Sequence, residues 1–345
     1  MKLRRLSLPF LRRDFVPPAD CCPEVESALA SAALLLEAAG VDTGRLDAEC
    51  LLAAVLGQPR WQLLLEPRRR LRAAEFARYL ALLQRREQRE PLAYILEKRE
   101  FWSVEMRVSP DVLVPRPETE TLVETALAVW RRGAPAGAPN AEGRAPRESR
   151  REHQVASDEP GGTSHEPLIV DLCTGTGAVA IALACEIPTA RVLATDVSAQ
   201  AVRLAQENVA AHGLSARIRC LRGDLWRAVN GQMPDGADLV VANPPYVRTG
   251  AIPSLMPEVG WEPRLALDGG PDGLRVIREI IATTPDRLCP GGWLLLEIGD
   301  EQAESVLALM TLTGRFEDAR VVQDLAGRPR IVAARRCDGP RARTA

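Results

Sequence analysis

Asn243, Pro244, Pro245 and Tyr246 stand together directly after the apolar run 238–242, which predicts a short buried strand. A residue before proline is pushed into an extended conformation, and proline has no N–H, so the loop offers carbonyl oxygens with few competing donors. The side chain of Asn243 adds an oxygen acceptor, and Tyr246 adds a flat ring face. These residues therefore predict a slot for a planar group that carries an NH2, either an amide or the exocyclic amine of a base. The alternative interpretation is a Pro-Pro turn after a strand.

A glycine-rich loop lies upstream, between a strand predicted at 167–172 and a helix predicted at 178–184. Gly175 and Gly177 let the backbone turn tightly and approach a ligand closely. The order strand, glycine turn, helix is the context in which such a loop binds a nucleotide. The alternative is a dinucleotide-binding oxidoreductase, but the loop lacks the full G-x-G-x-x-G pattern and no second dinucleotide-binding half follows.

Acidic residues follow the next two predicted strands. Asp196 ends the strand at 191–195, about 20 residues after the glycines, where an acidic side chain can bind ribose hydroxyls. Asp224 follows the strand at 218–222. Together with the proline loop, these features predict an S-adenosylmethionine-dependent N-methyltransferase, and loop capping is the alternative role for Asp171 and Asp224. The predicted cofactor-binding residues are Asp171, Cys173, Thr174, Gly175, Thr176, Gly177, Asp196, Asp224, Leu225 and Asn243.

The glycine loop at 171–177 and the loop at 243–246 resemble those of the HemK/PrmC family, the peptide chain release factor glutamine methyltransferases. The resemblance covers roughly residues 25–131 and 167–335. Further matching stretches are 99–102, the V-P-R-P-E-T-E stretch within 113–120, 262–270 and 326–330. Two positions depart from the family pattern, because Cys173 and Glu97 stand where glycine is common.

The resemblance implies a substrate and roles for the proline loop. The substrate is the glutamine of the GGQ motif in peptide chain release factors, which take part in translation termination. The implied catalytic residues are Asn243, Pro244 and Tyr246, and Pro245 joins them in binding the substrate. Arg116 is left with two interpretations, an anchor of the preceding linker or a lining residue of the cofactor pocket.

The elements around these motifs form two patterns. Helices predicted at 24–39, 45–56 and 71–89 make a small bundle, which the resemblance implies docks the protein substrate, and strands at 101–108 and 112–114 make a hairpin. From 167 onward strands and helices alternate, which is typical of a doubly wound α/β sheet. The strands are predicted at 168–172, 191–195, 218–222, 239–242 and 293–298, with an antiparallel pair at 319–323 and 330–334, and the helices at 178–186, 198–211, 273–287 and 301–312.

We expect a Rossmann-like class I methyltransferase sheet and an N-terminal helical domain joined by a β-hairpin. The segment 132–166 has almost no apolar bulk, which predicts a disordered insert. The predicted division is a flexible tail at 1–22, a helical domain at 23–91, the hairpin and linker helix at 92–131, the insert at 132–166, the methyltransferase domain at 167–336 and a flexible tail at 337–345.

Composition restricts the remaining possibilities. Lys+Arg total 44 against 46 Asp+Glu, so bulk charge does not indicate a nucleic-acid binder, and we expect no direct nucleic-acid binding. The eight cysteines form no C-x-x-C pair, so no metal site is predicted, and they suit the reducing cytoplasm. No segment is long and apolar enough to span a membrane. We expect a monomer in the cytoplasm, with a mitochondrial location as the alternative because residues 1–13 are basic.

Other functions remain open on the sequence. A DNA or RNA base methyltransferase would flip its base into the same slot, although such enzymes usually carry a basic face. A glutamine methyltransferase that acts on a ribosomal protein would share almost every motif. A non-catalytic S-adenosylmethionine-binding scaffold is the third alternative, and it would have no use for the slot at 243–246.

Overall fold

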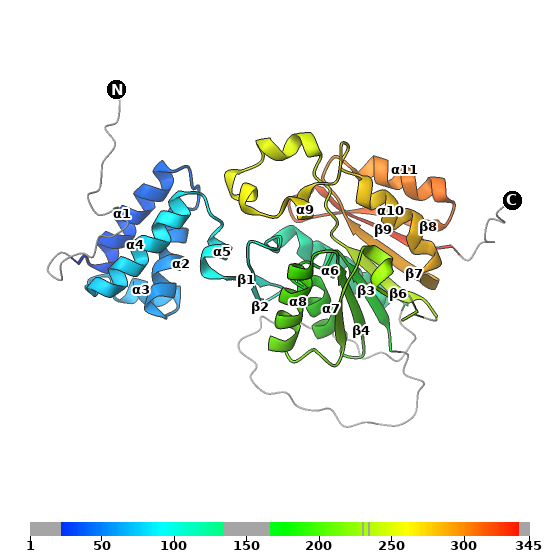
Figure 1. The fold of residues 1–345 in the computed structure, drawn as a ribbon, viewed down its shortest axis with the longest axis horizontal. Helices are drawn as coiled ribbons and strands as arrows, with labels where there is room; N and C mark the ends of the chain where they lie inside the picture. Colours follow the sequence, from blue (N-terminus) through cyan, green and yellow to red (C-terminus); the bar gives the residue numbers. More distant parts are fainter. Residues whose placement is uncertain (1–21, 134–165, 230, 234, 338–345) are drawn as a thin grey trace. The chain divides into compact units, whose positions relative to one another are not determined.

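A computed structural model describes residues 22–133, 166–229, 231–233 and 235–337. The tails predicted at 1–22 and 337–345 and the insert predicted at 132–166 lie outside these residues except at their boundary positions. The chain forms two compact units (Figure 1). The helical unit runs up to Val114 and also includes Thr249–Leu267, and the sheet unit comprises Pro115–Arg248 and the residues from Asp268 onward.

Five helices make up most of the helical unit (Figure 1). They are α1 (Val25–Ala38), α2 (Gly44–Leu56), α3 (Arg60–Leu65), α4 (Ala73–Glu87) and α5 (Leu92–Leu96). Leucines spaced along α1 and α2 and Tyr79 of α4 form one buried core, which is the expected use of an apolar stripe at helical spacing. The three predicted helices are confirmed as α1, α2 and α4, and α2 ends as predicted at Gly57, which adopts a left-handed φ of 65°.

A hairpin of β1 (Lys98–Phe101) and β2 (Val104–Arg107) follows α5. Its two turn residues, Trp102 and Ser103, have φ values of 54° and 58°. Positive φ at both central residues defines the type I′ turn that matches the twist of paired strands. The hairpin was therefore predicted in the right region, but its strands at 101–108 and 112–114 were wrong, because Trp-Ser lacks the Asn-Gly pattern that usually marks such a turn.

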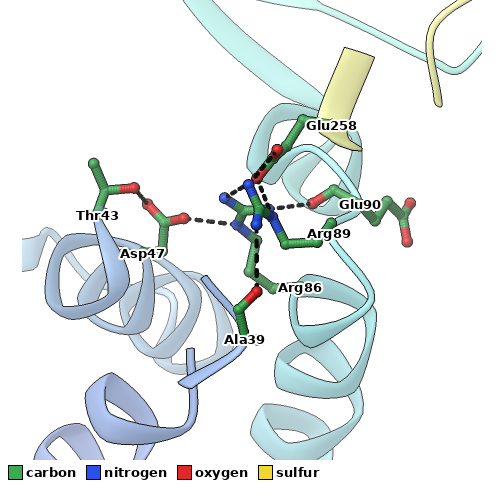
Figure 2. A network of polar contacts seen from close by, with 7 residues as sticks. All are labelled: Ala39, Thr43, Asp47, Arg86, Arg89, Glu90 and Glu258. Carbon is green, nitrogen blue, oxygen red and sulfur yellow. Dashed lines mark hydrogen bonds and ion pairs between the residues drawn. The ribbon is translucent and has the colours of Figure 1, made fainter. Parts of the chain in front are cut away.

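The segment Thr249–Leu267 belongs to the helical unit although it lies between two strands of the sheet in the sequence. It contains η4 (Thr249–Ser254), η5 (Pro257–Trp261) and α9 (Arg264–Leu267). Figure 2 shows how Glu258 ties it to α4. The Nε and Nη2 atoms of Arg89 each donate to Glu258 at 2.7 Å, and Arg86 Nη2 lies 2.9 Å from the same carboxylate.

The same network continues into α2 (Figure 2). Arg86 Nε donates to Asp47 Oδ2 at 2.7 Å, and Asp47 Oδ1 accepts from the Thr43 hydroxyl at 3.0 Å. Arg86 and Asp47 are only 5% and 4% exposed. Burial opposes the ionisation of Glu258, but the hydrogen bonds from the two arginines hold its pKa below the usual range. The network therefore fixes the segment to the helical unit through partly buried charges.

The sheet unit is built on one seven-stranded sheet of order β5-β4-β3-β6-β7-β9-β8 (Figure 1). The strands are β3 (Leu168–Leu172), β4 (Arg191–Asp196), β5 (Ile218–Arg222), β6 (Ala237–Ala242), β7 (Leu288–Glu297), β8 (Phe316–Gln323) and β9 (Pro329–Arg336). The first five are parallel, and β9 runs antiparallel to both β7 and β8, which confirms the predicted antiparallel pair.

Helices cover both faces of this sheet, as a parallel sheet requires. One face packs against α10 (Arg275–Thr283) and α11 (Ala303–Thr313), whose residues share a core with Val170, Val240 and Leu294. The other helices are α6 (Glu120–Gly133), α7 (Ala178–Glu186) and α8 (Ala199–Ala211), with short 3-10 helices η2 (Pro117–Thr119), η3 (Leu225–Val229) and η6 (Thr284–Asp286). Among the described helices, none has the length and apolarity needed to cross a bilayer.

Candidate active site

Four strand ends meet in one row at the centre of the sheet. The chain starts at β3, moves outward to β4 and β5, and returns to β6 on the other side of β3, so the strand order switches between β3 and β6. Leu172 pairs with Ala242 and with Thr195, and Ala242 pairs with Leu296. The residues that follow are Cys173, Asn243, Asp196 and Glu297. Ligands of doubly wound sheets bind at such a switch point, beyond the carboxyl ends of the strands.

The glycine loop leaves open space on its outer side. Gly175 has a φ of +55°, and nothing lies within 4 Å of the place where its side chain would begin. Gly177 has a φ of +81° and packs so closely on α8 that an added Cβ would lie 3.3 Å from the Cβ of Ala205. The Nδ2 of Asn208, also on α8, donates to the carbonyl of Thr176 at 2.9 Å. The loop is therefore held from behind and free in front, where a ligand has room.

Cys173 occupies a backbone conformation that favours glycine. Its φ is +60°, in the left-handed region, where a side chain costs roughly 1–2 kcal/mol. This explains why glycine is common at the corresponding family position. Burial raises the pKa of the Cys173 thiol, and Asp196, Asp171 and Asp224 add to the rise. All three predicted carboxylates thus lie near enough to this thiol to act on it electrostatically.

The carboxylates differ in their surroundings. Asp171 is 1% exposed and accepts from the Thr174 hydroxyl at 2.5 Å, as loop capping requires. Burial raises its pKa to about 7, against the effect of the hydrogen bonds from Thr174 and from the backbone of Ala180. Asp196 accepts from the backbone N–H of Gly175 at 3.0 Å and from that of Ser198 at 2.9 Å, while burial raises its pKa.

Asp224 and Leu225 lie just beyond β5. Leu225 is buried and has a φ of +45°, and it begins η3. The carbonyl of Asp224 accepts from the Arg227 N–H at 3.0 Å, which turns the chain into η3. The turn presents the backbone of these two residues beside the end of β4.

The loop from Asn243 to Tyr246 is braced from three directions. The Tyr246 hydroxyl donates to Glu297 Oε1 at 3.2 Å, and the Tyr246 carbonyl accepts from Gln302 Nε2 at 2.9 Å. Gly269 approaches so closely that an added Cβ would lie 2.6 Å from the Pro245 carbonyl oxygen. A side chain at Gly269 would therefore displace the loop, which explains why glycine stands at this position of the 262–270 stretch.

Asn243 is held by a residue of η2. Its Nδ2 donates to Thr119 Oγ1 at 3.2 Å. The Thr119 hydroxyl also hydrogen-bonds the Glu297 carboxylate, which is 1% exposed. Burial raises the pKa of Glu297 to about 7, and Thr119, Arg330 and Tyr246 act in the opposite direction.

Thr119, Glu297 and Gln302 belong to the site but are not among the site residues predicted from the sequence. Thr119 lies in the V-P-R-P-E-T-E stretch, and Glu297 ends an apolar strand at the level of Asn243. These two sequence features could have indicated that both residues lie near the site. Burial raises the pKa of the Tyr246 hydroxyl, and Arg116 is close enough to oppose this rise electrostatically, which puts this cation beside the proline loop. Within the described residues, no group of three or more His, Cys, Asp or Glu could hold a metal ion.

Residues 27–96 match the PrmC N-terminal domain, and residues 162–257 match the methyltransferase small domain. The chain is 39% identical to the release factor glutamine methyltransferase of Geobacter sulfurreducens over 86% of this chain and 91% of that protein. It is 38% identical to the release factor glutamine methyltransferase of Moorella thermoacetica over 90% of this chain and 98% of that protein.

Solved structures support the fold. The hMettl16 catalytic domain, crystallised in complex with the MAT2A 3′UTR hairpin 1, matches with a TM-score of 0.52 and 13% identity, over 74% of this chain and 80% of that chain. At this identity the likeness concerns the fold alone. The predicted class I methyltransferase sheet with a helical N-terminal domain is confirmed.

Proposed function

The chain belongs to the release factor glutamine methyltransferase family, and from this membership we propose that it methylates the side-chain amide nitrogen of the GGQ glutamine in a peptide chain release factor. The methyl donor is S-adenosylmethionine, and the reaction supports translation termination in the cytoplasm. The observation that carries the proposal is the placement of Asn243 and Pro244 level with the glycine loop across the strand-order switch. A bound nucleotide-like donor and an amide substrate can meet at this point.

The residues around the glycine loop fit such a cofactor. The open side of Gly175 admits a ligand against the backbone, and the carboxylate of Asp196 stands at the distance along the chain where ribose hydroxyls are bound. Asp224 and Leu225 border the same region from the end of β5. When bound, S-adenosylmethionine supplies a methyl group that is already activated on a sulfonium centre. The protein's task is therefore to prepare the acceptor.

An amide nitrogen is a poor nucleophile because its lone pair is shared with the carbonyl, the same resonance that gives a peptide bond its rotation barrier of roughly 18–20 kcal/mol. Asn243 Oδ1 and the Pro244 carbonyl can accept the two N–H groups of the substrate amide. These hydrogen bonds strengthen as positive charge develops on the nitrogen, so they stabilise the transition state more than the ground state. The Tyr246 ring can pack against the amide plane, and correct positioning can contribute about 7–11 kcal/mol.

A labelling experiment tests the substrate. The protein is incubated with methyl-labelled S-adenosylmethionine and, separately, with a release factor, the same factor with its GGQ glutamine replaced, ribosomal proteins, and DNA. We expect label only on the unaltered release factor. Label on a ribosomal protein or on DNA, or equal label on the factor without its glutamine, would contradict the proposal.

A further inference from the structure

The Asn243 side chain has two ends of nearly identical shape and opposite hydrogen-bonding character. Its Oδ1 accepts and its Nδ2 donates. If the amide turned by half a rotation, Nδ2 would face the NH2 of the substrate, and two donors would oppose each other. The site therefore needs a neighbour that distinguishes the nitrogen of Asn243 from its oxygen.

Thr119 is that neighbour, because its Oγ1 lies 3.2 Å from Asn243 Nδ2. A hydroxyl alone does not choose an orientation, since it can donate as well as accept. Above its pKa of about 7, Glu297 removes this freedom, because its carboxylate is then ionised and only accepts, and the Thr119 hydroxyl hydrogen-bonds it. Once the single Thr119 proton points to Glu297, Oγ1 can only accept from Asn243. Glu297, the buried end of this series of hydrogen bonds, then sets the direction of the bonds from Thr119 and from Asn243.

Tyr246 adds a second donor to the same carboxylate, at 3.2 Å from Glu297 Oε1. Glu297 is 1% exposed, so bulk solvent does not compete for these donors. Its carboxylate also feels the cation of Arg330 and, more weakly, the anion of Glu118. Thus one buried acidic group at the end of β7 lies behind both the Asn243 amide and the Tyr246 ring.

We propose that Thr119, backed by Glu297, is a positioning residue that fixes Asn243 with its oxygen toward the substrate amide. The inference rests on the proposed function, since it assigns this orientation to the glutamine acceptor. Thr119 touches neither the reacting atoms nor the cofactor in this role. Its loss should therefore affect turnover and leave binding of the methyl donor unchanged.

Two variants of Thr119 and one control variant test the role. Thr119→Val keeps the shape but removes the hydroxyl, and it should lower kcat about tenfold, the effect of losing the one hydrogen bond that orients Asn243. The KM for the release factor and the Kd for S-adenosylmethionine should stay within about twofold. Thr119→Ser should restore most of the rate. The matched control is Thr125→Val, because Thr125 is also buried but donates to the Thr121 carbonyl at 2.7 Å within α6.

Glu297→Gln completes the set, because an amide can donate to Thr119 and so allow the reversed chain of hydrogen bonds. It should lower kcat in the same direction as Thr119→Val. Wild-type kcat in Thr119→Val, or a loss that Thr119→Ser does not restore, overturns the inference.

A neutron structure of the free wild-type protein, from crystals held above the pKa of Glu297, gives an answer that needs no substrate and no variant. Deuterium on Asn243 Nδ2 directed at Thr119 Oγ1, and deuterium on Oγ1 directed at Glu297, is the expected result. The reversed pattern overturns the inference. If the wild-type enzyme fails to label a release factor while this pattern is found, the proposed substrate is wrong and the orienting role stands.

Discussion

Glu258→Gln should destabilise the helical unit by about 2–3 kcal/mol. Glu258 accepts from Arg89 Nε and Nη2 at 2.7 Å each, and Arg86 Nη2 lies 2.9 Å from its carboxylate. Arg86 retains Asp47 after the change, but Arg89 loses its only carboxylate among the partners drawn in Figure 2 and keeps one acceptor oxygen of the new amide and the Ala39 carbonyl at 3.3 Å. Removing one partner of a fully buried ion pair costs about 3–5 kcal/mol. We expect less here because the side chains of Glu258 and Arg89 are 17% and 19% exposed.

The assay is urea unfolding of the full chain, followed by a probe of the helical unit. The matched control is Glu105→Gln, which breaks the exposed pair between Lys98 and Glu105 at 2.8 Å, with side chains 50% and 65% exposed. Such a pair contributes at most about 1 kcal/mol. If Glu258→Gln costs no more than Glu105→Gln, the reasoning about partly buried charge in this network is refuted.

The pH dependence of that loss has a fixed sign. The pKa of Glu258 is lowered in the folded protein relative to its ordinary value of 4.5. Its contribution is therefore present above the unfolded pKa and lost as the pH falls through the folded pKa. The stability difference between the wild type and Glu258→Gln should accordingly shrink in acid. A difference that stays constant from pH 7 to pH 3 would mean that the charge of Glu258 is not its source.

Three further predictions concern the candidate active site. Asn243→Ala should reduce turnover by at least about 10²–10³-fold, the cost of losing one preorganised acceptor, while calorimetry finds S-adenosylmethionine binding within a few-fold; a fully active variant would end the proposed mechanism. Burial raises the pKa of Glu297 from 4.5 to about 7 in the folded protein. Protonated Glu297 therefore contributes its full stabilisation below the pKa of the unfolded chain, and this stabilisation is lost as the pH rises through the pKa of the folded protein. The unfolding free energy should thus fall more steeply between pH 4.5 and 7 in the wild type than in Glu297→Gln, and parallel curves would count against this. Cys173→Gly should raise the unfolding free energy by about 0.5–1 kcal/mol, because relief of the left-handed conformation exceeds the added chain entropy; a lower thermal midpoint would contradict it.

Much of the sheet unit could be predicted because its strands are buried on both faces and appear as short apolar runs such as 168–172. The glycine turn and the acidic residue at 196 follow such runs directly, so their place at strand ends was visible in the sequence. The hairpin was displaced because its type I′ turn is made by Trp102 and Ser103, which carry no usual turn pattern.

Contacts between residues far apart in the sequence could not be predicted in this way. Thr119 and Asn243 are separated by 124 residues, and their hydrogen bond depends on where η2 meets the end of β6. No local pattern encodes that meeting. Similarly, Glu258 follows the proline loop in the sequence, and only the folded chain shows that its partners are Arg86 and Arg89. Arg89 lies 169 residues before Glu258.

The return of the chain to the helical unit at Thr249–Leu267 has a consequence for building chimaeras. Exchanging residues up to Val114 with those of a relative would transplant the two arginines but leave Glu258 with the host. The hybrid would then depend on whether the donor's cations happen to match the host's carboxylate. A graft that also carries Thr249–Leu267 moves both sides of the network at once. The exchangeable module is therefore two pieces of sequence, and recombination at a single crossover would divide it.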